Sequence, residues 1–205
     1  MCFSAAASFT ASVCLTGVGI ASLRIATKKQ IIIAVIPLLF AIQQAIEGFQ
    51  WLAVGAGHVS ACAGYSFMFF ALILWPLYIP ITVYIFDKQR RYITRWFIGI
   101  SIALVSYFVF ILFRAPMQIE VLKHGIYYKI PMLFGRVTGT LYFIAICGAL
   151  LASSIRPFRI FGVATCVSVF IAALLFSTTF ASTWCFFAAF LSSLIYVYIK
   201  QNRQA

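Results

Sequence analysis

The chain has 205 residues, of which 64% are hydrophobic and only 9% are charged, and it carries a formal net charge of +12. A soluble domain has roughly a quarter charged residues, so this composition excludes a soluble globular protein. Nucleic acid is excluded as a partner, because the basic residues form short clusters between long apolar segments, as cytoplasmic loops do beside anionic lipid. The lipid bilayer is the first expected partner.

Seven segments are apolar enough to cross a membrane, since a spanning helix needs about 20 mostly apolar residues. In chain order they are Ser4–Leu23, Ile31–Val54, Cys62–Phe86, Ile93–Phe113, Pro131–Ser154, Ile160–Phe176 and Ala181–Ile199. The predicted fold is all-α: a polytopic membrane protein whose residues 1–205 form a single seven-helix transmembrane bundle.

The basic residues predict the orientation of this bundle. Most of them fall in loops on one side: Arg24, Lys28, Lys29, Lys88, Arg90, Arg91, Arg95, Arg156, Arg159, Lys200 and Arg203. Arg114, Lys123 and Lys129 fall on the other side. The positive-inside rule assigns the more basic side to the cytoplasm. The N-terminus is then outside and the C-terminus inside, which requires an odd number of spans.

Small residues and prolines predict how some spans pack. The first span carries Ser4, Ser8 and Ser12 at four-residue spacing, and the fifth contains a GxxxG pair, Gly135 and Gly139. Both patterns are typical of closely approaching helices. Pro76 and Pro80 should kink the third span.

The second span contains an unexpected polar face. Gln43, Glu47 and Gln50 recur at the spacing of one helix face, with Gln44 and Trp51 beside them. At 1.5 Å rise per residue, Glu47 lies roughly 24 Å along a helix that starts near Ile31, in the outer third of the membrane core. Ionisable residues in spans face the bundle interior and pair with one another. Such a face is therefore expected to point away from lipid.

Arg136 in the fifth span lies at a similar depth, so we predict that it pairs with Glu47. This pair has two interpretations: an ion pair that only pins two helices, or one wall of a polar pocket. The glutamine amides favour the pocket slightly, because they offer hydrogen-bond donors and acceptors to a ligand. The predicted pocket residues are Gln43, Gln44, Glu47, Gln50, Trp51, Arg136 and Trp184.

The cysteines and histidines leave three alternatives open. Cys2, Cys62 and Cys185 fall on the outer side of the predicted topology, where a disulfide between two of them is compatible with an oxidising compartment. Together with His58 they are also candidate ligands for Zn or Cu, although no CxxC or HExxH motif is present. The third alternative is that they are inert thiols, as expected for Cys14, Cys147 and Cys166, which lie within spans.

Three segments carry a resemblance to a known family: Met1-Cys-Phe-Ser-Ala5, the run Gln43-Gln44 to Glu47-Gly48 and Trp51, and Phe180-Ala-Ser-Thr-Trp184-Cys185-Phe-Phe-Ala-Ala189. The whole chain resembles an uncharacterised bacterial family of multi-pass membrane proteins. This resemblance implies no activity. It implies a multi-pass protein of the bacterial inner membrane, and it implies that Cys2, Glu47, Trp184 and Cys185 belong together.

The seven predicted spans also resemble the sugar-transporter and PQ-loop type of fold, in which three helices, a linker helix and three more helices follow one another. The corresponding segments are residues 1–86, 93–113 and 131–199. Ala21-Ser22-Leu23-Arg24 at the end of the first span is similar to Ser153-Ser154-Ile155-Arg156 at the end of the fifth, as a parallel repeat requires. The proline-glutamine signature is absent from the fifth span.

Three functions are compatible with these features. The first is a protein that binds or transports a small ligand through an outward-facing intramembrane pocket. The second is a membrane-embedded, metal-dependent hydrolase of a lipid-like substrate, with Glu47 as general base. The third is a structural subunit or assembly factor of a membrane complex. The sequence does not decide whether the chain is an enzyme or whether it forms a homo-oligomer.

Overall fold

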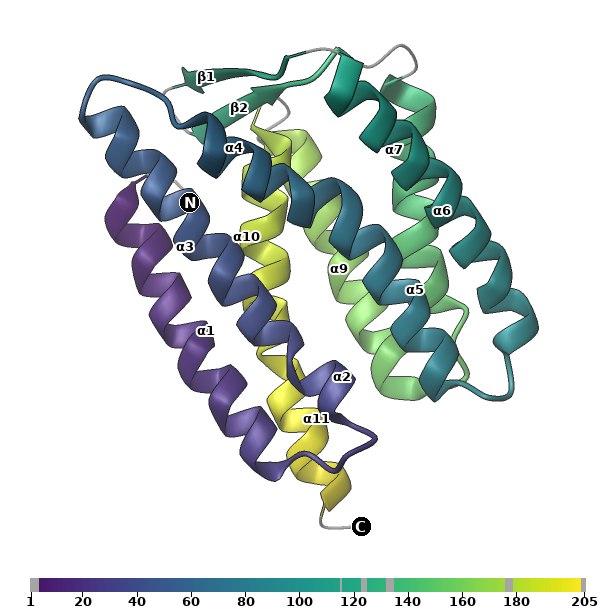
Figure 1. Ribbon diagram of the computed structural model, residues 1–205. Coiled ribbons are helices and arrows are strands. Elements are labelled where there is room, and N and C mark those ends of the chain that lie inside the picture. The colour runs from purple at the N-terminus through teal and green to yellow at the C-terminus, as the bar shows by residue number, and fades with distance from the viewer. Residues whose placement is uncertain (1–3, 115, 123–124, 132–134, 176–178, 204–205) are drawn as a thin grey trace. The chain divides into compact units, whose positions relative to one another are not determined.

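The computed structural model describes residues 4–114, 116–122, 125–131, 135–175 and 179–203, and the fold in these ranges is almost entirely helical (Figure 1). The elements are α1 (Ala5–Ile25), α2 (Ile31–Ala34), α3 (Ile36–Gly55), α4 (Ala61–Met68), η1 (Phe69–Leu74), α5 (Trp75–Phe86), α6 (Arg91–Arg114), β1 (Gln118–Leu122), β2 (Gly125–Lys129), α7 (Gly135–Phe143), η2 (Ile144–Gly148), α8 (Ala149–Leu151), α9 (Arg156–Leu175), α10 (Phe180–Ser192) and α11 (Leu194–Arg203). The segments η1 and η2 are π-helical. The predicted all-α membrane fold is confirmed.

Six helical segments of the described residues are long and apolar enough to cross a membrane. They are Ala5–Ile25, Ile31–Gly55, Ala61–Phe86, Arg91–Arg114, Arg156–Leu175 and Ser182–Gln201. The predicted fifth span, Pro131–Ser154, is the exception, because its described helix covers only Gly135–Leu151. Ser153 and Ser154 leave the helix and hydrogen-bond to Asp87 instead. A seventh crossing stays a prediction.

The segment between α6 and α7 lies outside the seven predicted spans, and it contains two strands that the sequence analysis did not predict. Strands β1 and β2 pair in a two-stranded sheet. Ile119 and Val121 alternate with the polar residues Gln118 and Glu120 in β1, which is the period-two pattern of a strand. β-Branched and aromatic residues, which favour strands, are frequent in both segments.

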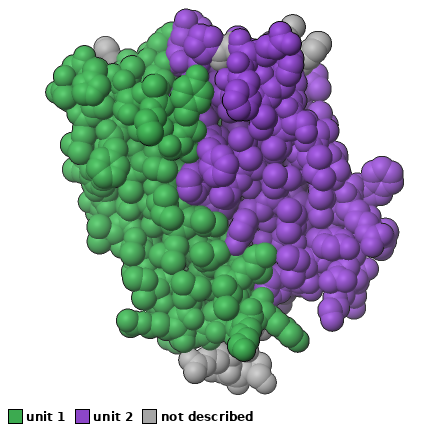
Figure 2. Space-filling model, in the orientation of Figure 1, with its two compact units in different colours: residues 1–67, 119–127, 168–205 green, residues 68–118, 128–167 purple. Residues whose placement is uncertain are grey.

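The described chain forms two compact units (Figure 2). Unit 1 contains residues 1–67, 119–127 and 168–205, and unit 2 contains residues 68–118 and 128–167. The expected arrangement of three helices, a linker and three helices stays a prediction.

In unit 1, small residues let α1 and α3 approach closely. Ser12 donates a hydrogen bond to the Ala41 carbonyl at 2.8 Å. A Cβ atom at Gly19 would lie 2.5 Å from the Leu38 side chain, and one at Gly48 would lie 2.9 Å from the Phe9 ring. These contacts run in opposite directions along the two helices, so α1 and α3 are antiparallel. The close approach predicted for the first span is confirmed, and Ser4 instead caps the helix by accepting from Ala7 N at 3.2 Å.

In unit 2, a π-helical segment precedes the prolines of the third span. The Trp75 N–H bonds to the Phe70 carbonyl, five residues back, rather than to the Ala71 carbonyl. The residue five beyond Ala71 is Pro76, which has no N–H to donate. The Ala71 carbonyl therefore has no donor within its own helix, and the Tyr142 hydroxyl donates to it at 2.5 Å.

The core of unit 2 lies around Leu104, Phe108 and Ala145. Gly148 of η2 lies against the ring of Phe97 in α6, where a Cβ atom would be only 2.6 Å from the ring. Gly139 behaves differently, because no described atom lies within 4 Å of a Cβ built there. The described residues therefore show no close approach at Gly139, and the packing predicted for the GxxxG pair stays a prediction.

Candidate functional site

The polar face of α3 is buried in unit 1. Gln43, Gln44, Glu47 and Gln50 each have 0% of their surface exposed. Helix α3 runs without a break from Ile36 to Gly55, so residues four apart stand one above the other on the same face. Burying three amides and a carboxyl group is costly unless these groups are hydrogen-bonded. The groups that surround these four side chains therefore form the candidate site.

Helix α10 supplies partners to two of these side chains. The Ser182 hydroxyl donates to Oε1 of Glu47. The Gln43 side-chain N–H donates to Sγ of Cys185 at 3.3 Å. Ser182 and Cys185 are three residues apart on α10, and Gln43 and Glu47 are four apart on α3, so both contacts form along one line between the helices. We call Gln43, Gln44, Glu47, Ser182 and Cys185 the α3–α10 polar cluster.

Helix α1 adds a further buried hydroxyl, that of Ser8, near the α3–α10 polar cluster. The antiparallel register of α1 and α3 places Ser8 opposite the turn from Gln44 to Gly48. Ser8 is fully buried, and its hydroxyl has no hydrogen-bond partner among the described residues. A buried hydroxyl without a partner loses its hydration without compensation. Ser8 thus adds a donor and an acceptor beside the cluster.

Gln50 has a different role from Gln43 and Glu47. The Gln50 amide is assigned the orientation in which both of its polar atoms have a partner. Its nitrogen then donates to the Ser60 carbonyl at 2.7 Å, and its oxygen accepts from the Ser60 N–H at 3.3 Å. The side chain thereby ties α3 to the start of α4. The intervening turn passes through Gly57, whose φ of 80° favours glycine. Gln50 fixes the end of the α3–α4 connection.

The two predicted tryptophans lie in unit 1. Trp51 is half-buried, and its indole N–H has no hydrogen-bond partner among the described residues. Trp184 is buried on α10 and stacks on Phe180 with 5.8 Å between ring centroids. Trp184 precedes Cys185, so the late Trp-Cys motif places one residue in the polar cluster and one beside it.

Arg136 belongs to the first turn of α7 in unit 2, and its side chain is exposed. The Glu47 carboxyl group accepts a hydrogen bond from Ser182, a residue of the same unit. Sequence spacing alone did not indicate this partner, because Ser182 is an ordinary apolar-helix residue 135 positions away. The Glu47–Arg136 pair stays a prediction.

The candidate metal ligands differ in their surroundings. His58 and Cys62 are exposed, Cys185 is buried, and Cys2 lies outside the described residues. The described residues contain no group of three His, Cys, Asp or Glu side chains close enough to hold a metal ion. Cys14, Cys62, Cys147, Cys166 and Cys185 are free thiols. The predicted Zn or Cu site is not confirmed, and neither Cys62 nor Cys185 forms a disulfide.

A second buried carboxylate, Asp87 in the loop between α5 and α6, was not among the residues predicted from the sequence. Its Oδ2 accepts from the Ser153 hydroxyl at 2.9 Å and from the Ser154 N–H at 2.5 Å. Its Oδ1 accepts from the Ser154 hydroxyl at 2.7 Å and from the Arg90 N–H at 3.2 Å. Burial alone would raise the pKa of Asp87, but the hydrogen bonds from Ser154, Ser153 and Arg90 together lower it.

Asp87 therefore joins two loops of unit 2. The Arg90 guanidinium adds a hydrogen bond to the Ala152 carbonyl at 3.0 Å, which links the same two loops again. One signal in the sequence was available: Asp87 is one of only three acidic residues, and it lies within a basic loop. A lone carboxylate there needs donors, which the serine pair at the end of the fifth span supplies.

Comparison with curated proteins and with solved structures gives no match in either case. Comparison with protein families does give one. The matching family is described as a family of unknown function (DUF6629), and the match covers residues 1–205. The chain therefore belongs to the DUF6629 family, a family of unknown function.

Proposed function

We propose that this multi-pass helical protein binds a small polar ligand at the α3–α10 polar cluster, and that binding there is a step in its transport or sensing. The ligand would hydrogen-bond to the amides of Gln43 and Gln44 and to the carboxyl group of Glu47. The pocket would open toward the outer side of the membrane.

One observation carries the proposal: a fully buried carboxyl group sits within a membrane-spanning helix and is held by Ser182. Ionisable residues at such positions are expensive, and they mark ligand or ion pathways more often than ordinary packing. A purely structural link between α3 and α10 needs no carboxyl group, because an apolar pair of the same shape would stabilise it as well or better.

Three features support a ligand rather than a structural role. The cluster combines two amides, a carboxyl group, a hydroxyl and a thiol, so it offers both donors and acceptors. The Ser8 hydroxyl, which has no partner among the described residues, adds a further group. Trp184, with its large apolar ring, lies next to Cys185 on α10. Ligand sites typically combine a few polar groups with aromatic surface in this way.

Water access to Cys185 tests the pocket directly. A variant that keeps Cys185 as its only cysteine is treated with a cationic methanethiosulfonate, which forms a mixed disulfide with an accessible thiol. The control keeps only Cys147, which is also buried but lies in unit 2, outside the cluster. We expect Cys185 to react and Cys147 to remain unmodified. Equal protection of both thiols would show that the cluster is dry and would contradict the proposal.

Glu47→Gln then tests the role of the carboxyl group. A carboxylate attracts cations and repels anions, so the Cys185 variant should react faster with the cationic reagent than with its anionic sulfonate analogue. Adding Glu47→Gln should remove this preference while leaving thermal stability in detergent similar, because the glutamine still accepts from Ser182. An unchanged preference would exclude Glu47 from the pocket.

A further inference from the structure

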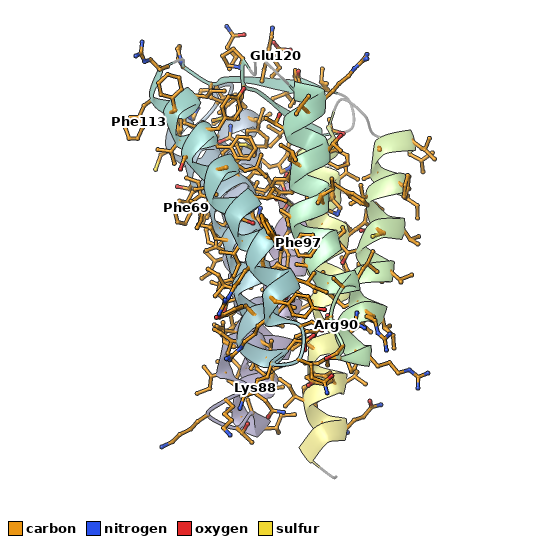
Figure 3. All side chains as sticks on the ribbon, turned by 90° about the vertical axis from the view of Figure 1, so that its right-hand side faces the viewer. Phe69, Lys88, Arg90, Phe97, Phe113 and Glu120 are labelled. Atoms are coloured by element: carbon orange, nitrogen blue, oxygen red, sulfur yellow. The ribbon has the colours of Figure 1, made fainter. Side chains whose placement is uncertain are left out.

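Two loops at one end of unit 2, together with the helix turns that follow them, carry most of its positive charge. They lie between α5 and α6 and between α8 and α9, at the end of α6 opposite Phe113, where Figure 3 labels Lys88 and Arg90. The basic residues of these loops, of the first two turns of α6 and of the first turn of α9 form what we call the basic surface: Lys88, Arg90, Arg91, Arg95, Arg156 and Arg159. Asp87 is the only acidic residue in these loops and helix turns, so together they have an excess of five positive charges.

Side-chain contacts hold the two loops together. Asp87 accepts from both Ser153 and Ser154, and Arg90 donates to the Ala152 carbonyl. The rings of Phe86 and Phe158, next to the loops, pack edge to face with 5.8 Å between centroids. The residues of the basic surface are therefore carried by two segments that are fixed to one another, and not by separate mobile connections.

The charges of this surface are not neutralised within the described part of the chain. None of the six basic side chains forms an ion pair there. All four hydrogen bonds to the Asp87 carboxylate come from serine groups and the Arg90 backbone, so none is made by a basic side chain. Lys88, Arg156 and Arg159 make no side-chain hydrogen bond to a described residue. Their donors are available to an external anion.

Two of the arginines are held close to one another. The Arg91 guanidinium lies 5.0 Å from the centre of the Tyr84 ring, and that of Arg95 lies 5.9 Å from the same centre. Arg91 also donates to the Tyr84 carbonyl at 3.0 Å. Like charges four residues apart on a helix destabilise it. An anion between them would relieve this repulsion, and guanidinium groups bind phosphate with paired hydrogen bonds.

Aromatic side chains place this surface at the level of lipid headgroups. Tyr92 and Trp96, on the same turns of α6, are 67% and 77% exposed. Exposed tyrosine and tryptophan rings are typical of the membrane–water interface. Basic and aromatic residues thus alternate at the beginning of a helix that is apolar enough to cross the bilayer.

We propose that the basic surface binds the phosphate headgroup of an anionic phospholipid. Its partner is a lipid rather than a soluble phosphate, because the charges lie next to interfacial aromatic residues. The excess charge distinguishes anionic from zwitterionic headgroups, since each basic residue near an anionic surface adds attraction. The Asp87 junction preorganises the site by fixing both loops before lipid arrives. This site is separate from the α3–α10 polar cluster and does not depend on its role.

The experiment compares two triple variants of the full-length protein purified in detergent. Lys88→Gln, Arg156→Gln and Arg159→Gln together remove three charges from the basic surface without removing a hydrogen bond between described residues. Lys28→Gln, Lys29→Gln and Lys200→Gln remove three exposed charges from unit 1 as the matched control. Native mass spectrometry measures binding of phosphatidylglycerol and of phosphatidylcholine with the same acyl chains.

We expect the wild-type protein to prefer phosphatidylglycerol, and the first triple variant to bind it roughly 10- to 100-fold more weakly. The control should lose less than about threefold, because its charges lie outside the basic surface and are screened by solvent. The preference should also decrease as salt is added. Equal losses in both variants, or no preference in the wild-type protein, would overturn the proposal.

Two further measurements distinguish a lipid site from damage to the fold and from a site for soluble phosphate. The single variant Lys88→Gln removes one charge and should weaken binding by a smaller factor, with an unchanged melting temperature in detergent. Soluble glycerol 3-phosphate carries the same headgroup chemistry without acyl chains. If it displaces phosphatidylglycerol at equal concentration, the surface recognises a soluble phosphate compound and the assignment to lipid is wrong. Displacement only at a large excess supports the lipid.

Discussion

Asp87 and Glu47 are both buried acidic residues held by serines, yet the sequence indicated only one of them. Glu47 is conspicuous because it interrupts a long apolar run. Asp87 lies in a loop among basic residues, where an acidic side chain is expected to be solvated. Neither set of serine partners was predictable, because Ser182 is 135 residues from Glu47 and Ser153 is 66 residues from Asp87. Local patterns identify a buried polar residue, whereas tertiary packing selects its partner.

Asp87→Asn should lower the free energy of unfolding by about 1–3 kcal/mol at neutral pH. The asparagine NH₂ group would face a donor, such as the Ser154 N–H, where the carboxylate oxygen now accepts. Thermal unfolding in detergent, followed by circular dichroism, measures the loss. Ser154→Ala is the companion variant, since it removes one donor and keeps the carboxylate, and it should cost less.

The cost of Asp87→Asn should also depend on pH. The pKa of Asp87 is lowered in the folded protein from its ordinary value of 3.8, so its stabilisation is complete above that value. This stabilisation is lost as the pH falls through the lowered pKa that Asp87 has in the folded protein. The difference between wild type and variant should therefore be constant from pH 7 to about pH 5 and shrink below pH 4. A difference that grows with acidification would contradict this assignment.

At the scale of elements, backbone hydrogen bonding explains features that hydropathy does not show. Pro76 and Pro80 indicate an irregular third span, and the irregularity is the π-helical segment Phe69–Leu74 on the N-terminal side of Pro76. The strands β1 and β2 were missed because the short polar segment between two apolar spans looked like a loop. The prolines thus indicated where the third span departs from an α-helix, whereas nothing in the hydropathy indicated the two strands.

Tyr142→Phe should destabilise unit 2 by about 1 kcal/mol, because it removes the donor to the Ala71 carbonyl, which has no donor within its own helix. Tyr107→Phe is a matched control in the same unit. The Tyr107 hydroxyl is shielded from solvent and has no hydrogen-bond partner among the described residues, so its removal should cost nothing. Thermal unfolding of both variants in the same detergent provides the comparison. Equal losses would show that the Tyr142 hydroxyl contributes no specific hydrogen bond.

At the scale of the whole molecule, the number and length of apolar segments were the most reliable signal. Six of the seven predicted spans correspond to helices of spanning length, with ends within a few residues. The fifth was predicted too long, since Ser153 and Ser154 are compatible with a membrane helix by hydropathy but bind Asp87 in the structure. Hydropathy measures compatibility with lipid, and it does not record a competing hydrogen-bond acceptor elsewhere in the chain.

The predicted orientation leads to a labelling experiment in intact cells. Exposed Cys62, in a variant that lacks the other cysteines, should react with a membrane-impermeant maleimide added outside. Lys88→Cys in a cysteine-free background should react only after the membrane is permeabilised, because the basic loops are assigned to the cytoplasm. Labelling is detected as a gel shift with a polyethylene-glycol maleimide. Reaction of Lys88→Cys in intact cells would reverse the assigned orientation.

The two π-helical segments have a consequence for how this chain compares with its relatives. A π-helical turn contains one residue more than the α-helix on either side, and one residue corresponds to a rotation of about 100°. If a family member lacks one residue within Phe69–Leu74 or Ile144–Gly148, the π-helical turn becomes an α-helical turn. The helical segments before and after it then keep the same faces toward their neighbours. Single-residue deletions inside membrane helices, normally disruptive, should be tolerated at these two places, and alignments of the family should allow gaps there.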